Sequence, residues 1–129
     1  MDQRRREKIK TEMQKAEEYL RAADILHKNG LLAPSVSASY HSSIHASMAA
    51  FLVSGNRLTQ KESFKDLDEK LGKFCLKLDP FIERAKDARG DWESGADIDY
   101  TENEALLRLY QTREFFLEVK DFLRRTMKF

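Results

Sequence analysis

The sequence predicts an all-α protein, an up-and-down bundle of four to five helices that forms a single domain over residues 1–129. The chain of 129 residues is long enough to bury one core and too short to divide comfortably into two. Charged residues make up 35% of it, which suits exposed helix faces, and 5 glycines and 2 prolines leave a sheet short of turn residues. Apolar residues also recur at helical period along most of the chain.

A first helix is predicted from about Gln3 to Asn29. Gly30 can end it, because glycine readily adopts the left-handed conformation that often follows a helix. The apolar positions lie three or four residues apart, at Ile9, Met13, Ala16, Leu20, Ala23 and Leu26.

Pro34 fits the first turn of a second helix, which is predicted to end near Gly55. Only a few residues connect it to the first helix, so we expect the two to pair as an antiparallel hairpin. One face carries Val36, Tyr40, Ile44, Met48 and Phe51.

Two further helices are predicted in the middle of the chain. Thr59 and Glu62 have the spacing of a capping box, in which each side chain satisfies a backbone N–H of the other residue. Asp79 can cap, and Pro80 can open, a fourth and shorter helix that ends at about Ala88. The third helix would turn inward Phe64, Leu67, Leu71, Phe74 and Leu78.

The next stretch, "RGDWESGADIDY", lacks helical period, and we interpret it as a loop of a length that is often functional. Thr101 and Glu104 then repeat the capping-box spacing. A last helix follows, with Leu106, Leu109, Thr112, Phe116, Val119 and Leu123 at helical period.

The formal net charge is +1, so no overall excess of positive charge attracts the chain to a nucleic acid or an anionic membrane. Two basic clusters remain, one from Arg4 to Lys10 and one of Arg124, Arg125 and Lys128. We interpret each as a solvated terminal turn rather than as an RNA footprint. Antiparallel first and last helices would bring the clusters to one end of the bundle and parallel ones would separate them, and the sequence leaves both arrangements open.

The single cysteine, Cys75, excludes an intrachain disulfide and favours a reducing compartment; we interpret it as a small core residue. No run approaches the roughly 18 apolar residues of a membrane span, and no signal-peptide pattern follows the charged N-terminus. We therefore expect a soluble, cytoplasmic protein without membrane contact. The chain has no glycine-rich phosphate loop of Walker or Rossmann spacing, and we expect no cofactor.

His41 and His45 lie one helical turn apart in the stretch "SVSASYHSSIHASMAAFL". Two-histidine metal ligation uses this spacing, but Ser42 stands where the zincin pattern needs a glutamate, and no third ligand is evident nearby. We therefore predict no metal site. The pattern favours helix packing, in which small side chains let another helix approach closely and the imidazoles are hydrogen-bonded at the seam. These small residues are Ser39, Ser42, Ser43, Ala46 and Ala49.

Several short patterns in the first half of the chain resemble those of one known family. The stretch "AEEYLRAADILHKNG" is similar to a first-helix pattern A-x-x-Y-L-x-A-A with a closing Asn-Gly pair, and "ASYHSSIHA" is similar to a second-helix pattern [SA]-x-Y-[YH]-x-x-x-H-A. Both patterns are those of the HEPN-domain family (higher-eukaryote and prokaryote nucleotide-binding domain). The matching residues are Ala16, Tyr19, Leu20, Ala22, Ala23, Asn29, Gly30, Ala38, Tyr40, His41, His45 and Ala46.

The resemblance extends to roughly Leu123. "ARGDW" resembles the family's R-x-x-A-D-Y with a shortened spacing: Arg89 and Asp91 are kept and Trp92 replaces the tyrosine. "TENEA" is similar to the closing T-x-E-E-A, and "TREF" is similar to A-x-E-F. Each pattern is weak alone, but their order and separation together are moderately specific.

The resemblance implies an up-and-down helical bundle that often dimerises and that commonly pairs with a minimal nucleotidyltransferase in a toxin–antitoxin system. Some members are metal-independent ribonucleases, whose active site is an arginine, a spacer of four to six residues and a histidine on a late helix. This sequence departs from them, because no histidine follows His45 and Arg89 therefore has no downstream partner. Arg21 and His27 have a fitting spacing, but they lie on the first helix, and we treat that match as chance.

Three functions stay open. The chain is a binding module for a nucleotidyltransferase partner or a nucleotide; or it is a ribonuclease that uses His41 or His45 with Arg89; or it is a structural homodimer without a ligand. The expected catalytic residues of the second are unknown beyond the weak candidates His45 and Arg89. The binding face of the first would hold Tyr40, His41, His45, Arg89, Asp91 and Trp92.

Overall fold

A computed structural model describes residues 3–53 and 100–127 of the chain. These residues form three helices, α1 (Gln3–Lys28), α2 (Leu32–Val53) and α5 (Glu102–Met127). The described part of the chain is therefore all-α, as predicted. The predicted third and fourth helices, Cys75 and the loop residues 89–99 lie outside the described residues.

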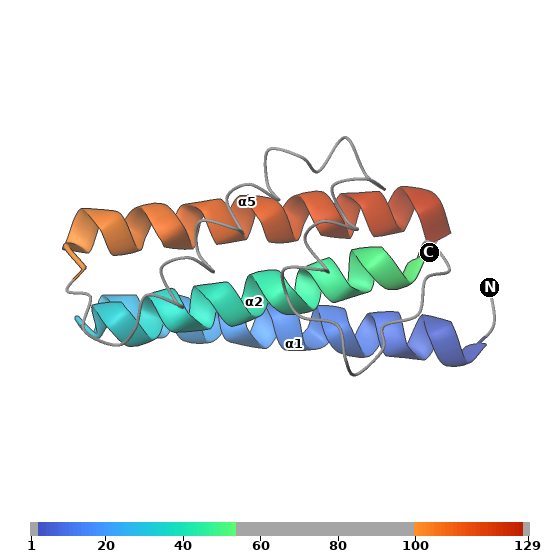
Figure 1. Cartoon of the computed structure of the whole chain (residues 1–129), viewed down its shortest axis with the longest axis horizontal. Helices are drawn as coiled ribbons and strands as arrows, with labels where there is room; N and C mark the ends of the chain where they lie inside the picture. The colour runs from blue at the N-terminus through green and yellow to red at the C-terminus, as the bar shows by residue number, and fades with distance from the viewer. Residues whose placement is uncertain (1–2, 54–99, 128–129) are drawn as a thin grey trace.

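The three helices lie side by side along one long axis (Figure 1). α1 and α2 form the predicted antiparallel hairpin, and α5 runs parallel to α2 and antiparallel to α1. This direction settles the arrangement that the sequence left open, because it brings Arg4 to Lys10 of α1 to the same end as Arg124 and Arg125 of α5. Lys128 lies outside the described residues.

Helix α1 ends at Lys28, and Gly30 terminates it as predicted. The glycine has a φ of 77°, and its N–H bonds to the carbonyl of His27 at 3.0 Å. The N–H of Leu31 reaches back to the carbonyl of Leu26 at 2.9 Å. Together these two bonds form a Schellman motif, which satisfies carbonyls that the helix leaves without a partner and turns the chain into α2.

A capping box opens α5, also as predicted. The N–H of Glu104 donates to Thr101 Oγ1 at 3.2 Å, and the N–H of Thr101 donates to Glu104 Oε2 at 3.1 Å. These two reciprocal hydrogen bonds therefore set the residue at which α5 begins.

The seam between α1 and α2 is made of small side chains, as predicted from the second helix. Ser35 Oγ donates to the carbonyl of Ala23, and Ser42 Oγ donates to the carbonyl of Ala16, each at 2.7 Å. All four of these residues are fully buried, at 0% exposure. The two serines are seven residues apart, and so are the two alanines, so the pattern repeats every two turns.

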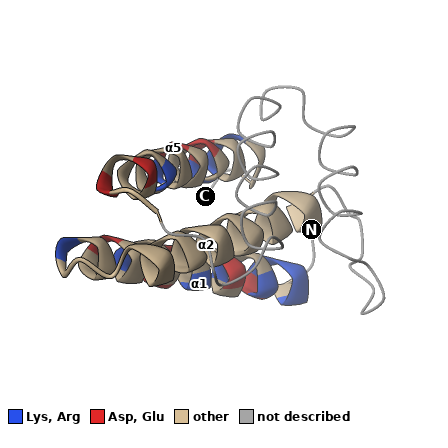
Figure 2. Ribbon diagram, turned by 60° about the vertical axis from the view of Figure 1, so that its left-hand side comes forward, with Lys and Arg blue, Asp and Glu red and all other residues tan. Residues whose placement is uncertain are grey.

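Helix α2 is the central element of the described structure. It carries no Asp, Glu, Lys or Arg, whereas α1 and α5 are charged along their outer sides (Figure 2). Most of its residues are buried, as is typical of a helix that is largely enclosed in a core. One stripe is only partly buried, and it consists of Ser37, His41, His45 and Met48. The largest core cluster joins α2 to Ile9 of α1 and to Phe115, Phe116, Val119 and Leu123 of α5. None of the described helices is long and apolar enough to span a membrane.

Candidate functional site

A carboxylate and an imidazole meet across the α1–α2 seam. His45 Nδ1 lies 2.6 Å from Glu12 Oε2, and their side chains are 20% and 12% exposed. Because an ionised carboxylate only accepts hydrogen bonds, His45 Nδ1 carries the hydrogen. In the neutral ring Nε2 is then the nitrogen with a free lone pair, as it is in histidines that a carboxylate orients for proton transfer.

Tyr19 of α1 covers both histidines of α2. Its ring stacks on His45 with 5.5 Å between centroids and 6° between planes, and on His41 with 5.3 Å and 29°. The ring of Tyr40 meets the edge of His41 at 5.7 Å. We call these residues the histidine cluster: Glu12, Tyr19, Tyr40, His41 and His45.

Burial changes the proton affinity of one member of the cluster. The pKa of His41 is lowered from its ordinary value of 6.5, mainly because burial disfavours the charged imidazolium and secondarily because His45 is nearby. His41 is therefore held in its neutral form more firmly than an exposed histidine at the same pH.

A surface pocket of about 510 Å³ borders the cluster. Lys15, Glu18 and Ala22 form one stripe of α1 with Tyr19, and His45 completes the lining from α2. Tyr19 is 39% exposed, so part of its ring faces solvent. Lys15 has no ion-pair partner among the described residues, so the pocket combines an open aromatic face with an uncompensated cation.

The structure places the other predicted site residues in different surroundings. Tyr40 is 3% exposed and packs with Ile44 and against the edge of His41, and neither Tyr40 nor His41 lines the pocket. The residues Arg89, Asp91 and Trp92 lie outside the described part of the chain.

Arg21 and His27 do not share a site. Arg21 pairs with Glu17 at 3.8 Å on the exposed side of α1, while His27 Nε2 lies 3.4 Å from the backbone carbonyl of Glu102. Within one chain, the two side chains therefore do not form a catalytic pair.

Glu12 and Tyr19 were absent from the binding face predicted from the sequence. They are seven residues apart, hence two turns apart on one face of α1, and His41 and His45 are one turn apart on α2. The antiparallel hairpin was predicted, but its register depends on which small residues meet at the seam. With Ser35 opposite Ala23 and Ser42 opposite Ala16, Glu12 and Tyr19 necessarily come level with the histidines.

The described residues contain no group of three or more His, Cys, Asp or Glu side chains that could hold a metal ion. The helix-packing interpretation of the histidines agrees with the geometry: small residues line the seam, and His45 is hydrogen-bonded across it. A comparison of the sequence with models of known protein families gives no match, and a comparison with curated proteins gives none either.

Proposed function

We propose that the chain is a HEPN-like module, an up-and-down bundle of four to five helices, that binds a nucleotide through the histidine cluster and its pocket. In this proposal it acts in the cytoplasm as a homodimer and as one half of a toxin–antitoxin pair, with a nucleotidyltransferase as its protein partner. The proposal rests on the sequence resemblance together with one observation, the Tyr19 ring stacked on both imidazoles at the edge of a pocket that also holds Lys15.

The chemistry of the pocket fits a nucleotide. A base can stack on the exposed side of Tyr19, because every base has a π-face and aromatic platforms bind bases with little regard to sequence. Lys15 supplies a positive charge for a phosphate, and Glu18 can accept a hydrogen bond from an exocyclic amino group. The Tyr19 ring stacks on both imidazoles, and this contact keeps the ring in one orientation.

Calorimetric titration with ATP, GTP, CTP and UTP in EDTA tests the proposal. Tyr19→Leu should weaken binding about tenfold, because base–aromatic stacking contributes about 1–3 kcal/mol per base. Lys15→Gln should weaken triphosphates more than nucleosides. Tyr110→Leu is the matched control, since Tyr110 is a solvent-exposed tyrosine on α5, 50% exposed against 39% for Tyr19.

Absence of binding to all four nucleotides, or equal loss in the Tyr19 and Tyr110 variants, would refute a nucleotide site here. Arg89→Ala and Trp92→Ala, run in parallel, report whether the proposed binding face also includes those residues. Co-purification with a nucleotidyltransferase that Tyr19→Leu abolishes, without nucleotide binding, would assign the same face to the protein partner.

The Glu12–His45 hydrogen bond favours a second candidate, a metal-independent ribonuclease. In that reaction His45 Nε2 would take the proton from an RNA 2′-hydroxyl, whose oxygen attacks the adjacent phosphorus to form a 2′,3′-cyclic phosphate. The 5′-oxygen of the next nucleotide leaves and takes up a proton from water, which restores its hydroxyl. A cation such as Lys15 or Arg89 would stabilise the negative charge that develops on the phosphate oxygens. Cleavage of a mixed RNA in EDTA that is lost in His45→Ala and reduced in Glu12→Gln, but retained in His27→Ala, would establish it.

A structural homodimer without a ligand is the third candidate. Light scattering that finds a monomer would remove it, whereas a dimer is compatible with all three functions.

A further inference from the structure

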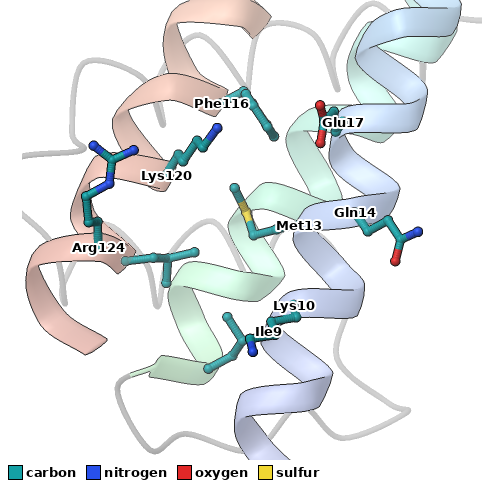
Figure 3. Close-up of a pocket in the computed structure, with 9 residues that line it drawn as sticks. Ile9, Lys10, Met13, Gln14, Glu17, Phe116, Lys120 and Arg124 are labelled. Carbon is teal, nitrogen blue, oxygen red and sulfur yellow. The ribbon is translucent and has the colours of Figure 1, made fainter. Parts of the chain in front are cut away.

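A groove of about 400 Å³ lies between α1 and α5, away from the histidine cluster (Figure 3). These two helices make the least extensive of the three helix contacts, so they diverge enough to leave a gap over the core. The volume lies within the range of small-molecule sites. None of its lining residues borders the pocket of the histidine cluster.

The floor of the groove is apolar. Ile9 is 0%, Leu123 3% and Phe116 7% exposed, and all three belong to the main core cluster. Met13 lies between the two helices close to Phe116, and its unbranched side chain can adapt to an irregular ligand (Figure 3). A ligand that fills this space would therefore extend the core with its own apolar part.

The α5 side of the groove carries two adjacent cations. Lys120 and Arg124 are four residues apart on α5, so their like charges repel on one helix face. Neither has an ion-pair partner in the described part of the chain. Their neighbours are compensated: Asp121 pairs with Arg125 at 3.0 Å, and Glu17, the one carboxylate in the lining, pairs with Arg21 at 3.8 Å.

Lys10 adds a third basic side chain from the facing helix α1. It stands in a run that is itself basic, since residues 3–15 hold six Lys or Arg side chains against two glutamates. The antiparallel packing of α1 and α5 places this run beside Lys120 and Arg124. The excess of positive charge at the mouth of the groove therefore comes from Lys120 and Arg124, although the whole chain has a net charge of only +1.

We propose that this groove binds an anionic amphiphile, a molecule with a linear alkyl body and a single carboxylate head. The alkyl body lies along Ile9, Met13, Phe116 and Leu123, and the carboxylate sits between Lys120 and Arg124. An arginine and a lysine one turn apart can both donate to one carboxylate, which removes their mutual repulsion. The ligand is thus defined by two independent properties of the groove, its apolar floor and the Lys120 and Arg124 side chains, which have no ion-pair partner among the described residues.

Methyl NMR of the full chain labelled with [¹³C-methyl]methionine tests this directly. Decanoate is titrated below its micelle concentration, and the Met13 methyl signal, identified by its loss in Met13→Leu, should shift and saturate. Met48 is the internal control, because it packs on the same core cluster as Met13 but does not line the groove. Decyltrimethylammonium, with the same chain and the opposite charge, should produce no saturable shift of Met13.

The charge of the rim is tested with the double variant Lys120→Gln and Arg124→Gln. It should weaken decanoate about fivefold, as expected for the loss of two solvent-accessible ion pairs. The double variant Lys28→Gln and Arg113→Gln removes two solvent-accessible cations that pair with Asp24 outside the groove, and it should leave the affinity unchanged.

Three results would overturn the proposal: an unmoved Met13 signal, equal binding of the cationic amphiphile, or equal affinity in the two double variants. A response to an acidic peptide but not to decanoate would likewise refute it and would assign the groove to a protein partner. The nucleotide titrations above use other residues, so failure of one proposal leaves the other standing.

Discussion

Glu12 Oε2 and His45 Nδ1 lie 2.6 Å apart, one side chain from each helix of the α1–α2 hairpin. The pair is mostly buried, so bulk water cannot fully compensate either side chain for the loss of its hydrogen-bond partner. Charge-assisted hydrogen bonds of this kind are about twice as strong as neutral ones. The contact therefore both holds the hairpin and fixes the tautomer of His45.

Glu12→Ala should lower the free energy of unfolding by about 1–3 kcal/mol, because it leaves the His45 Nδ1–H without its acceptor. Urea unfolding followed by circular dichroism measures the change. Glu18→Ala removes an exposed glutamate from the same helix and should stay within about 0.5 kcal/mol of the parent. Equal effects of the two substitutions would show that the Glu12–His45 contact contributes little.

Two buried serines of α2 should respond in opposite ways to alanine. Ser42 Oγ donates to the Ala16 carbonyl, so Ser42→Ala should cost about 1 kcal/mol. Ser39 is 1% exposed, and its Oγ has no hydrogen-bond partner in the described structure, so Ser39→Ala should be neutral or slightly stabilising. Thermal and urea unfolding of both variants make the comparison, and a larger loss for Ser39→Ala would contradict the hydrogen-bond assignment.

The unfolding free energy should fall as the pH drops below about 6.5. The pKa of His41 is lowered in the folded protein, so the unfolded chain binds more protons at mildly acidic pH and is favoured there. His41→Gln should flatten the difference between pH 7.5 and pH 5.5 in urea unfolding. His27→Gln, at the other end of the hairpin, should leave that difference as it is, and a slope that survives in His41→Gln would assign it to other groups.

Gly30→Ala should destabilise the protein by about 1–2 kcal/mol, through the backbone alone. The φ of 77° is unfavourable for a residue with a Cβ, whereas no heavy atom lies within 4 Å of the place that the Cβ would occupy. Gly30→Asn should cost less, because asparagine tolerates the left-handed region better. An equal loss for alanine and asparagine would indicate a cause other than the backbone angle.

The helix ends could be predicted from the sequence because they depend on local chemistry. Gly30 after α1 and Thr101 with Glu104 before α5 act on atoms within a few residues of themselves, and the structure confirms both. The direction of α5 depends on the chain between Val53 and Tyr100, and no local pattern encodes it.

The candidate site was only half predictable for a related reason. Tyr40, His41 and His45 share one helix and stand out in the sequence, but the register of two helices decides that Glu12 and Tyr19 join them. The burial of Tyr40 agrees with its place on the predicted apolar face beside Ile44, whereas His41 and His45 lie on a partly exposed stripe of the same helix.

The paired serines of the α1–α2 seam also oppose any sliding of α2 along α1. A slide of α2 by one turn, about 5.4 Å, would leave at most one serine opposite Ala16 or Ala23, because the residues three and four positions from Ser35 and Ser42 include only Ser39 as a hydroxyl donor. Such a slide would also separate His45 from Glu12. The two hydroxyls thus fix the register of α1 and α2. Only one alignment lets both serines donate to the alanine carbonyls, and that alignment assembles the histidine cluster.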